Sequence, residues 1–305
     1  MKQSYLHRLG KDFKRNRALY VMLIPILAFY ILFCFKPMYG VLMAFYDYKP
    51  AKGFSGSKWV GLKHFIEYFN SPYFGRTIKN TLAISLGFLV FSFPCPIILA
   101  LLLNEVRNSK FKKTIQTVTY LPHFISLVVI CGMLTSFSLT SGLFNDVSEF
   151  FGGTRSSLLS NPKAYRPIYI ISGIWRELGW NTIIYLAALS SVDTQLYEAA
   201  KIDGASKWRQ TIHVTLPGIL PTIVIKLIMQ IGTLMSVGYE KTLLLYNPSI
   251  YETADIISTY VYRMGLENFQ YSYGTAVDLF NSVINILLVV MANKISKKLT
   301  DSSLW

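Results

Sequence analysis

Six long apolar stretches divide this chain, and they decide what it can fold into. They cover residues 19–35, 81–103, 117–139, 168–189, 219–239 and 276–295. A helix needs about 20 mostly apolar residues to cross the hydrocarbon layer of a bilayer, and each stretch has roughly that length. The second and third contain no Asp, Glu, Lys or Arg. The pattern predicts an all-α membrane protein with six transmembrane helices.

The composition favours a membrane protein over a soluble, a disordered or a nucleic-acid-binding protein. Of the 305 residues, 52% are hydrophobic and 15% are charged, whereas soluble domains carry about 25% charged residues. Such hydrophobicity also excludes intrinsic disorder. The net charge of +14 would suit nucleic-acid binding only with a basic face on a soluble domain. Because the basic residues lie between apolar stretches, we predict membrane lipid as the surroundings and no nucleic-acid partner.

The basic segments predict the orientation. Lys and Arg gather in residues 1–18, in residues 104–113 and near the C-terminus, and such segments stay in the cytoplasm. We therefore expect a cytoplasmic leader (residues 1–18), a six-helix permease domain (19–295) and a cytoplasmic tail (296–305). Within the domain, segment 191–217 is expected inside and segment 36–80 outside. The outer segment is basic, against the rule, but the rule weakens in long loops.

No pattern typical of an enzyme is present. Cys34, Cys95 and Cys131 lie inside apolar stretches without paired spacing, and the four histidines are scattered. No G-x-x-x-x-G-K-[ST] phosphate loop occurs. We predict no catalytic residue, no metal site and no ATPase site in this chain.

Segment 191–217 carries the most specific signal. Its residues predict a short helix at 195–202, a turn at Gly204 and a second helix at 206–214 that ends before Pro217. Ser206 is a suitable N-cap, and glycine tolerates the positive φ that ends a helix. Helices this short are marginal in water unless they dock on another surface. The segment therefore predicts a partner-docking element, with an ordinary amphipathic connector as the alternative.

The spacing of Glu198-Ala199-Ala200, Gly204 and Leu216-Pro217 resembles the EAA loop of bacterial ABC importer permeases, with Val214 where Ile is usual. The resemblance implies the MetI-like architecture of type I importers. It also implies that the loop forms coupling helices on an ATPase subunit. The residues implied in this coupling are Glu198, Ala199, Ala200, Asp203, Gly204, Ala205, Leu216 and Pro217.

The resemblance extends to the carbohydrate branch of these permeases. Residues 202–205 with Trp208, and residues 22–25, 35–40, 59–62 and 303–305, are similar to polysaccharide-type, LplB-like members. This implies a bacterial plasma-membrane importer of an oligosaccharide or polysaccharide fragment. The implied partners are a second homologous permease in a heterodimer, two ATPase subunits that bind ATP and Mg²⁺, and an extracellular sugar-binding protein. The chain itself would hold no cofactor.

Polar residues inside apolar helices are costly, which makes them candidates for a substrate pathway. The candidates are Trp175, Asn181, Tyr185, Gln230, Thr233, Asp278, Asn281 and Asn285. The Asn and Gln side chains would also serve for hydrogen bonds between helices, and Arg176 with Glu177 could be a structural pair. An importer of amino acids or phosphate, or an ion-coupled secondary transporter, stays open as an alternative.

Overall fold

The computed structural model describes residue 13 and residues 15–300. Most of the predicted leader, the end of the predicted tail and the motif at 303–305 lie outside these residues. The first half of the chain contains α2 (Arg17–Phe29), α3 (Lys36–Met38), β1 (Tyr46–Asp47), β2 (Lys58–Trp59), α4 (Lys63–Phe69), α5 (Tyr73–Ser92), α6 (Pro94–Glu105), α7 (Ser109–Tyr120), α8 (Leu127–Phe137) and α9 (Leu143–Phe150). The second half contains α10 (Pro162–Ser190), α11 (Thr194–Ile202), α12 (Lys207–Gln210), α13 (Leu216–Gly232), α14 (Tyr239–Leu245), α15 (Tyr251–Ala254), α16 (Ile257–Tyr262) and α17 (Tyr271–Thr300).

Four helical stretches in the described part are long and apolar enough to cross a membrane. They are Arg17–Phe45, Tyr73–Glu105, Lys207–Gly232 and Tyr271–Lys298. A fifth candidate is the pair Ser109–Phe124 and Leu127–Phe137, which bends by 94°. The bend follows Pro122, whose ring cannot donate a backbone hydrogen bond. The remaining predicted span, 168–189, lies within the 29-residue helix α10, which is more polar because it carries Arg166, Arg176 and Glu177.

Two predicted boundaries were wrong. The fifth apolar stretch was expected to be helical to residue 239, but α13 ends at Gly232. The chain turns there, and the side chain of Asn285 on α17 accepts the backbone N–H of Met235 at 3.0 Å. The first helix runs on to Phe45 through π and 3₁₀ turns. The predicted outer segment 36–80 therefore begins with helix and contains a short antiparallel ladder, in which Tyr46 pairs with Trp59.

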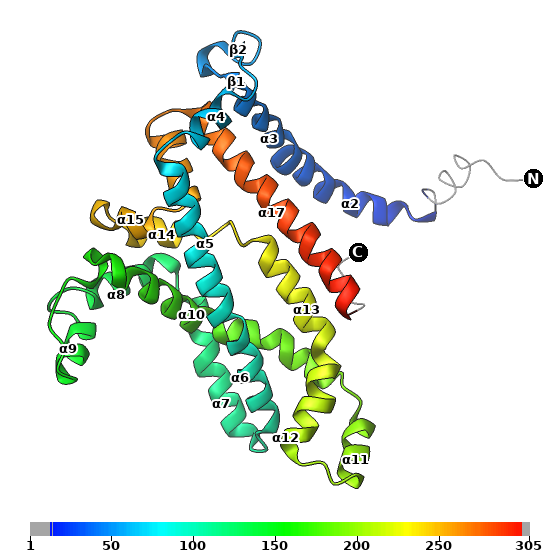
Figure 1. Ribbon diagram of the computed structural model, residues 1–305. Coiled ribbons are helices and arrows are strands. Elements are labelled where there is room, and N and C mark those ends of the chain that lie inside the picture. Colours follow the sequence, from blue (N-terminus) through cyan, green and yellow to red (C-terminus); the bar gives the residue numbers. More distant parts are fainter. Residues whose placement is uncertain (1–12, 14, 301–305) are drawn as a thin grey trace, which may run out of the picture.

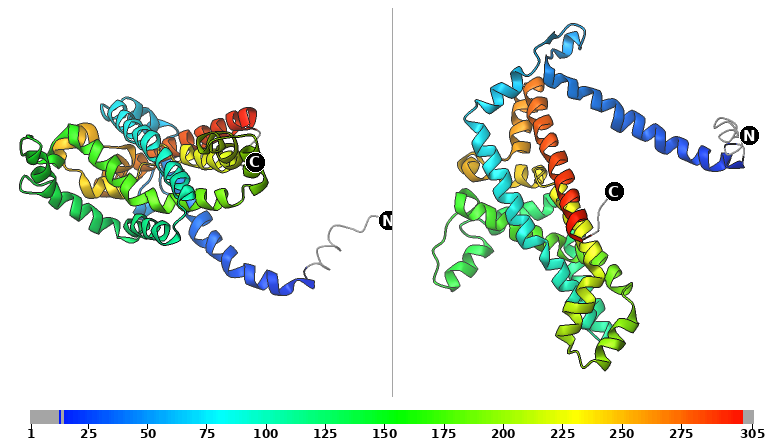
Figure 2. Two further views of the ribbon diagram at one scale, coloured as in Figure 1. Left: turned by 90° about the horizontal axis from the view of Figure 1, so that it is seen from below. Right: turned by 45° about the vertical axis from the view of Figure 1, so that its right-hand side comes forward.

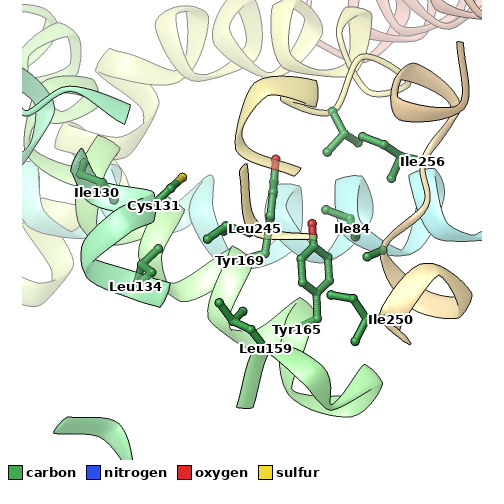
Figure 3. Packing of buried hydrophobic residues seen from close by; sticks show 12 residues of the cluster. Ile84, Ile130, Cys131, Leu134, Leu159, Tyr165, Tyr169, Leu245, Ile250 and Ile256 are labelled. Carbon is green, nitrogen blue, oxygen red and sulfur yellow. The ribbon is translucent and has the colours of Figure 1, made fainter. Parts of the chain in front are cut away.

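The main buried cluster joins elements that are distant in sequence. Figure 3 shows Cys131 and Leu134 of α8, Tyr165 and Tyr169 of α10, and Leu245 of α14 around one apolar interior. Ile84 of α5 packs against it together with Ile250, Ala254 and Ile256. The segment between α13 and α17 is thus packed into the helical body, and it forms the wall of the cavity described below.

The helix α2 differs from the rest of the described chain. It extends away from the other helices in both views of Figure 2, and none of its residues is buried. Its exposed side chains are almost all apolar, among them Leu19, Met22, Ile26 and Phe29. In the monomer this helix has a surface suited to lipid or to another protein.

Candidate functional site

The 191–217 loop has the helix–turn–helix form that the sequence predicts. Asp193 caps α11 by accepting the backbone N–H of Gln195 at 2.9 Å, and Ser206 caps α12 by accepting that of Arg209. Between them Gly204 has a φ of +73°, and the backbone N–H of Ala205 donates to the carbonyl of Ala200 at 2.8 Å. The turn therefore depends on a backbone conformation that L side chains adopt only with strain.

One detail of this prediction was wrong. The second helix does not stop before Pro217, because α12 continues through a π turn, Thr211–Thr215, directly into α13. Proline needs no hydrogen-bond acceptor for its nitrogen, and the wider π turn precedes it without a break in the helix. Leu216 and Pro217 therefore begin α13, and α12 is the first part of one continuous helical stretch, Lys207–Gly232 (Figure 1).

The loop exposes large apolar side chains to its surroundings. No residue of α11 is buried, and Ile202 and Trp208 are 87% and 72% exposed. Of the predicted coupling residues, Glu198, Ala199, Asp203, Gly204 and Pro217 are exposed, whereas Ala200, Ala205 and Leu216 are partly buried. Internal bonds hold the loop in shape, such as that from Tyr197 to Thr215 at 3.0 Å. An ordered, exposed apolar surface of this kind is typical of a protein-binding site.

A cavity of about 510 Å³ lies between α5, α10 and the segment after α13. A second, of about 300 Å³, shares Phe88, Glu177, Gln230 and Thr233 with it. Of the predicted pathway residues, Gln230 and Thr233 line both cavities, and Asn181 and Tyr185 line the second. The structure therefore brings these four residues to one place.

The other four pathway candidates lie elsewhere. Trp175 lines a separate apolar groove beside α8. Asn285 joins α17 to the turn after α13, since it accepts from Met235 and donates to Ser236. Asn281 is buried, and its Oδ1 has no hydrogen-bond partner among the described residues. Asp278 is exposed on α17.

The first cavity also holds charged groups. The side chain of Arg176 donates to Glu177 at 2.7 Å, so the two form the pair considered from the sequence. Glu177 also contacts the ring of His123 at 3.1 Å, and that ring stacks on Trp180. Lys241, which follows the fifth predicted span, lines the same cavity. Nothing in its local sequence, next to Glu240, indicates that it is buried.

The structure contains a second polar cluster, which the sequence did not predict. Asp255 is fully buried and accepts hydrogen bonds from Arg76 of α5 at 3.1 Å, from Arg263 at 2.7 Å and 3.1 Å, and from Thr259. Burial lowers the pKa of Arg263, but the bonds to Asp255 outweigh it and the pKa is raised. These residues, called the Asp255 cluster below, hold the segment after α15 against α5.

The side-chain amide of Asn80 connects the Asp255 cluster to α10. The side chain of Asn80 donates to the carbonyls of Glu252 and Asp255 at 3.0 Å each, and it accepts from Arg166 at 2.8 Å. Because its partners lie more than eighty residues away in sequence, this network could not be found from local patterns.

Comparison with known proteins identifies the family. The family described as "binding-protein-dependent transport system inner membrane component" matches residues 92–301, which include the cavity-lining helix α10 and the whole 191–217 loop. The chain belongs to this family. The predicted resemblance to importer permeases is confirmed.

Relatives within this family are similar over nearly the whole chain. The polygalacturonan/rhamnogalacturonan transport system permease protein YteP of Bacillus subtilis is 46% identical over 292 residues, which cover 95% of this chain and 91% of YteP. Protein LplB of Bacillus subtilis is 44% identical over 293 residues, or 96% of this chain and 92% of LplB.

Solved structures agree with the fold. A chain of a bacterial ABC transporter involved in the import of the acidic polysaccharide alginate is 44% identical, with a TM-score of 0.88 over 96% of this chain and 99% of that one. A second structure of a bacterial alginate ABC transporter, in complex with an alginate pentasaccharide-bound periplasmic protein, also gives a TM-score of 0.88. The MetI-like permease fold and a bacterial membrane location follow from this membership.

Proposed function

We propose that this permease is the membrane subunit of an ATP-binding-cassette importer for an oligosaccharide or polysaccharide fragment. The observation that carries the proposal is that one chain combines an exposed 191–217 loop with a cavity whose largely apolar wall also carries polar and charged residues. The chain also belongs to a family of transport components, and similar proteins are named for the transport of polygalacturonan and alginate. The chain would provide the path, and a separate ATPase subunit would bind ATP and Mg²⁺ and supply the energy.

The proposed topology has six spans with both termini in the cytoplasm. Four candidate spans, the bent pair as a fifth and the long helix α10 as a sixth support this number. The antiparallel helices α13 and α17 support the orientation, because the start of α13 and the end of α17 lie toward the same end of the molecule (Figures 1 and 2). Lys294, Lys297 and Lys298 near that end of α17 favour the cytoplasmic side.

The proposed partners follow from exposed surfaces. The 191–217 loop would dock on the ATPase with Glu198 and the small residues Ala199 and Ala200 at the contact. The unburied helix α2 would pack against a second, homologous permease. That second permease would complete the cavity, and two ATPase subunits would serve the pair. An extracellular sugar-binding protein would deliver the glycan at the opposite side.

The mechanism would be alternating access. Closure of the ATPase pair would push the 191–217 loop, and α12 would pass the movement directly to α13 because the helix is continuous between them. Movement of α13 would shift Gln230 and Thr233, which line both cavities. The cavities would thereby open to one side of the membrane at a time.

The test is uptake into proteoliposomes that contain this chain with its second permease and ATPase, plus the binding protein outside. We expect uptake of labelled oligosaccharide that requires internal ATP and stops when the ATPase is inactivated. Uptake without ATP, or driven by an ion gradient, would contradict the proposal in favour of a secondary transporter.

A further inference from the structure

A buried lysine faces the larger cavity without a carboxylate to neutralise it. Lys241 of α14 is only 9% exposed and lines that cavity. Its ammonium donates to the backbone carbonyl of Tyr169 at 2.7 Å and lies 4.4 Å from the centre of the Tyr169 ring. Within the described residues, no carboxylate oxygen comes within 4.0 Å of it. A buried ammonium is costly unless an opposite charge is present.

The fold makes room for this ammonium. A Cβ at Gly173 of α10 would lie 3.3 Å from the Lys241 Nζ and 2.6 Å from the ring of Phe88. Only glycine therefore lets the lysine lie across α10 beside the aromatic ring. Three residues further along the helix, Arg176 lines the same cavity, and its buried Nε has no hydrogen-bond partner. Two cations with unused donors thus face one space.

Neither of the two acidic residues that line the cavity forms an ion pair with Lys241. The carboxylate of Glu177 is already engaged by Arg176 and by His123. Glu240 also lines the cavity, but its side chain is exposed and its carboxylate does not come within 4.0 Å of the Lys241 ammonium. The cavity wall also carries the aromatic ring of Phe88, the hydroxyl of Ser85 and the amide of Gln230. This mixture suits a sugar ring with hydroxyl groups and a carboxylate.

We propose that Lys241, with Arg176 beside it, binds the carboxylate of an acidic oligosaccharide as it passes through the cavity. The translocated glycan would then be built from uronic acids, with Lys241 as a residue that selects for their charge. This inference rests on the proposed function and specifies its substrate class. The substrate carboxylate would supply the ion-pair partner that Lys241 lacks in the resting cavity.

The experiment measures binding to the complete transporter in lipid nanodiscs, without the binding protein. The probes are trigalacturonate and its trimethyl ester, which has the same rings but no charge. For the wild type we expect about tenfold tighter binding of the acid, as for one hydrogen bond between charged groups. Lys241→Met is expected to remove this preference by weakening acid binding and leaving ester binding within about twofold.

Two further variants separate charge recognition from a structural role. Lys241→Arg keeps a cation and should retain the preference. Lys163→Met changes an exposed lysine on α10 away from the cavity and should behave as the wild type. An unchanged preference in Lys241→Met would overturn the proposal, as would equal loss of both ligands or a wild type without preference. If one of these results is found and the transporter still takes up oligosaccharide with ATP, the inference of an acidic substrate is wrong, but the proposed function stands.

Discussion

The 191–217 loop and the Asp255 cluster show two different ways in which a polar region is stabilised. In the loop, hydrogen bonds join residues of the loop itself, such as Tyr197 and Thr215, and α11 buries no residue. In the cluster, Asp255 has no exposed surface, and its bond to Arg76 crosses 179 positions of sequence. The cluster is complete within one chain, whereas the loop presents a surface that only a partner would cover. Changes in the cluster should therefore damage the fold, and changes in the loop should damage transport.

The largest effect is expected for Asp255→Asn. This change leaves Arg76 and Arg263 without the carboxylate that they share, and loss of one partner of a buried ion pair costs about 3–5 kcal/mol. The thermal unfolding midpoint of the detergent-purified chain should fall clearly. Asp203→Asn, which alters an exposed carboxylate in the loop, is the matched control and should leave the midpoint unchanged. Equal unfolding midpoints for the two variants would contradict the claim that the Asp255 cluster, and not the loop, stabilises the fold.

A smaller, local effect is expected for Gly204→Val. A Cβ at this position meets no atom within 4 Å, so the penalty comes only from the backbone at φ +73° and amounts to about 1–2 kcal/mol or more for a β-branched residue. The turn should rearrange, and ATP-driven uptake should fall at least about tenfold while the membrane level and unfolding midpoint stay the same. Gly204→Asn, which tolerates positive φ better, should retain more transport. Normal uptake by the valine variant would contradict the docking role.

Glu198→Arg should affect assembly and not the fold. Glu198 is exposed on α11, so reversal of its charge disturbs only a contact with a partner. Association with the ATPase should weaken about tenfold, a typical effect for one charged hydrogen bond at an interface, and co-purification measures it. Glu252→Arg, the same change at an exposed site on α15, should not alter association. If the ATPase co-purifies with Glu198→Arg as well as with the wild type, Glu198 does not contribute to the contact.

The smallest effect is expected for the ion pair between Lys207 of α12 and Glu105 of α6, which are 2.9 Å apart. Both side chains are well exposed, and such pairs contribute about 0–1 kcal/mol. Glu105→Gln should therefore leave uptake within about twofold of the wild type. A loss as large as that of Gly204→Val would mean that this bond, and not the partner, holds the loop in place.

Local patterns were enough to predict the parts of the fold that depend on local physics. The apolar stretches located α5–α6, α13 and α17, and the cap at Ser206 and the turn at Gly204 are confirmed because their hydrogen bonds lie within a few residues. The end of α13 was misplaced because Asn285, fifty positions away, takes part in the turn. The helix continued through Pro217 because a π turn, which no residue type marks, precedes it.

The candidate site was predicted unevenly for the same reason. Gln230 and Thr233 share a helix face, so their common position on the cavity follows from helical spacing. Lys241 and the Asp255 cluster depend on how α14 and α16 fold back against α5 and α10. Charged residues after an apolar stretch usually lie in water, and only the packing of this segment shows that Lys241 and Asp255 are buried.

The most direct test of the account is hydrogen–deuterium exchange on this chain with and without the ATPase subunit, with its second permease present in both samples. We expect the amides of residues 194–210 to exchange at least about tenfold more slowly when the ATPase is bound. Those around Asp255 should not change, because that cluster is already complete. Equal exchange of the 194–210 amides in both samples, with the ATPase bound elsewhere, would contradict the claim that this loop is the docking site.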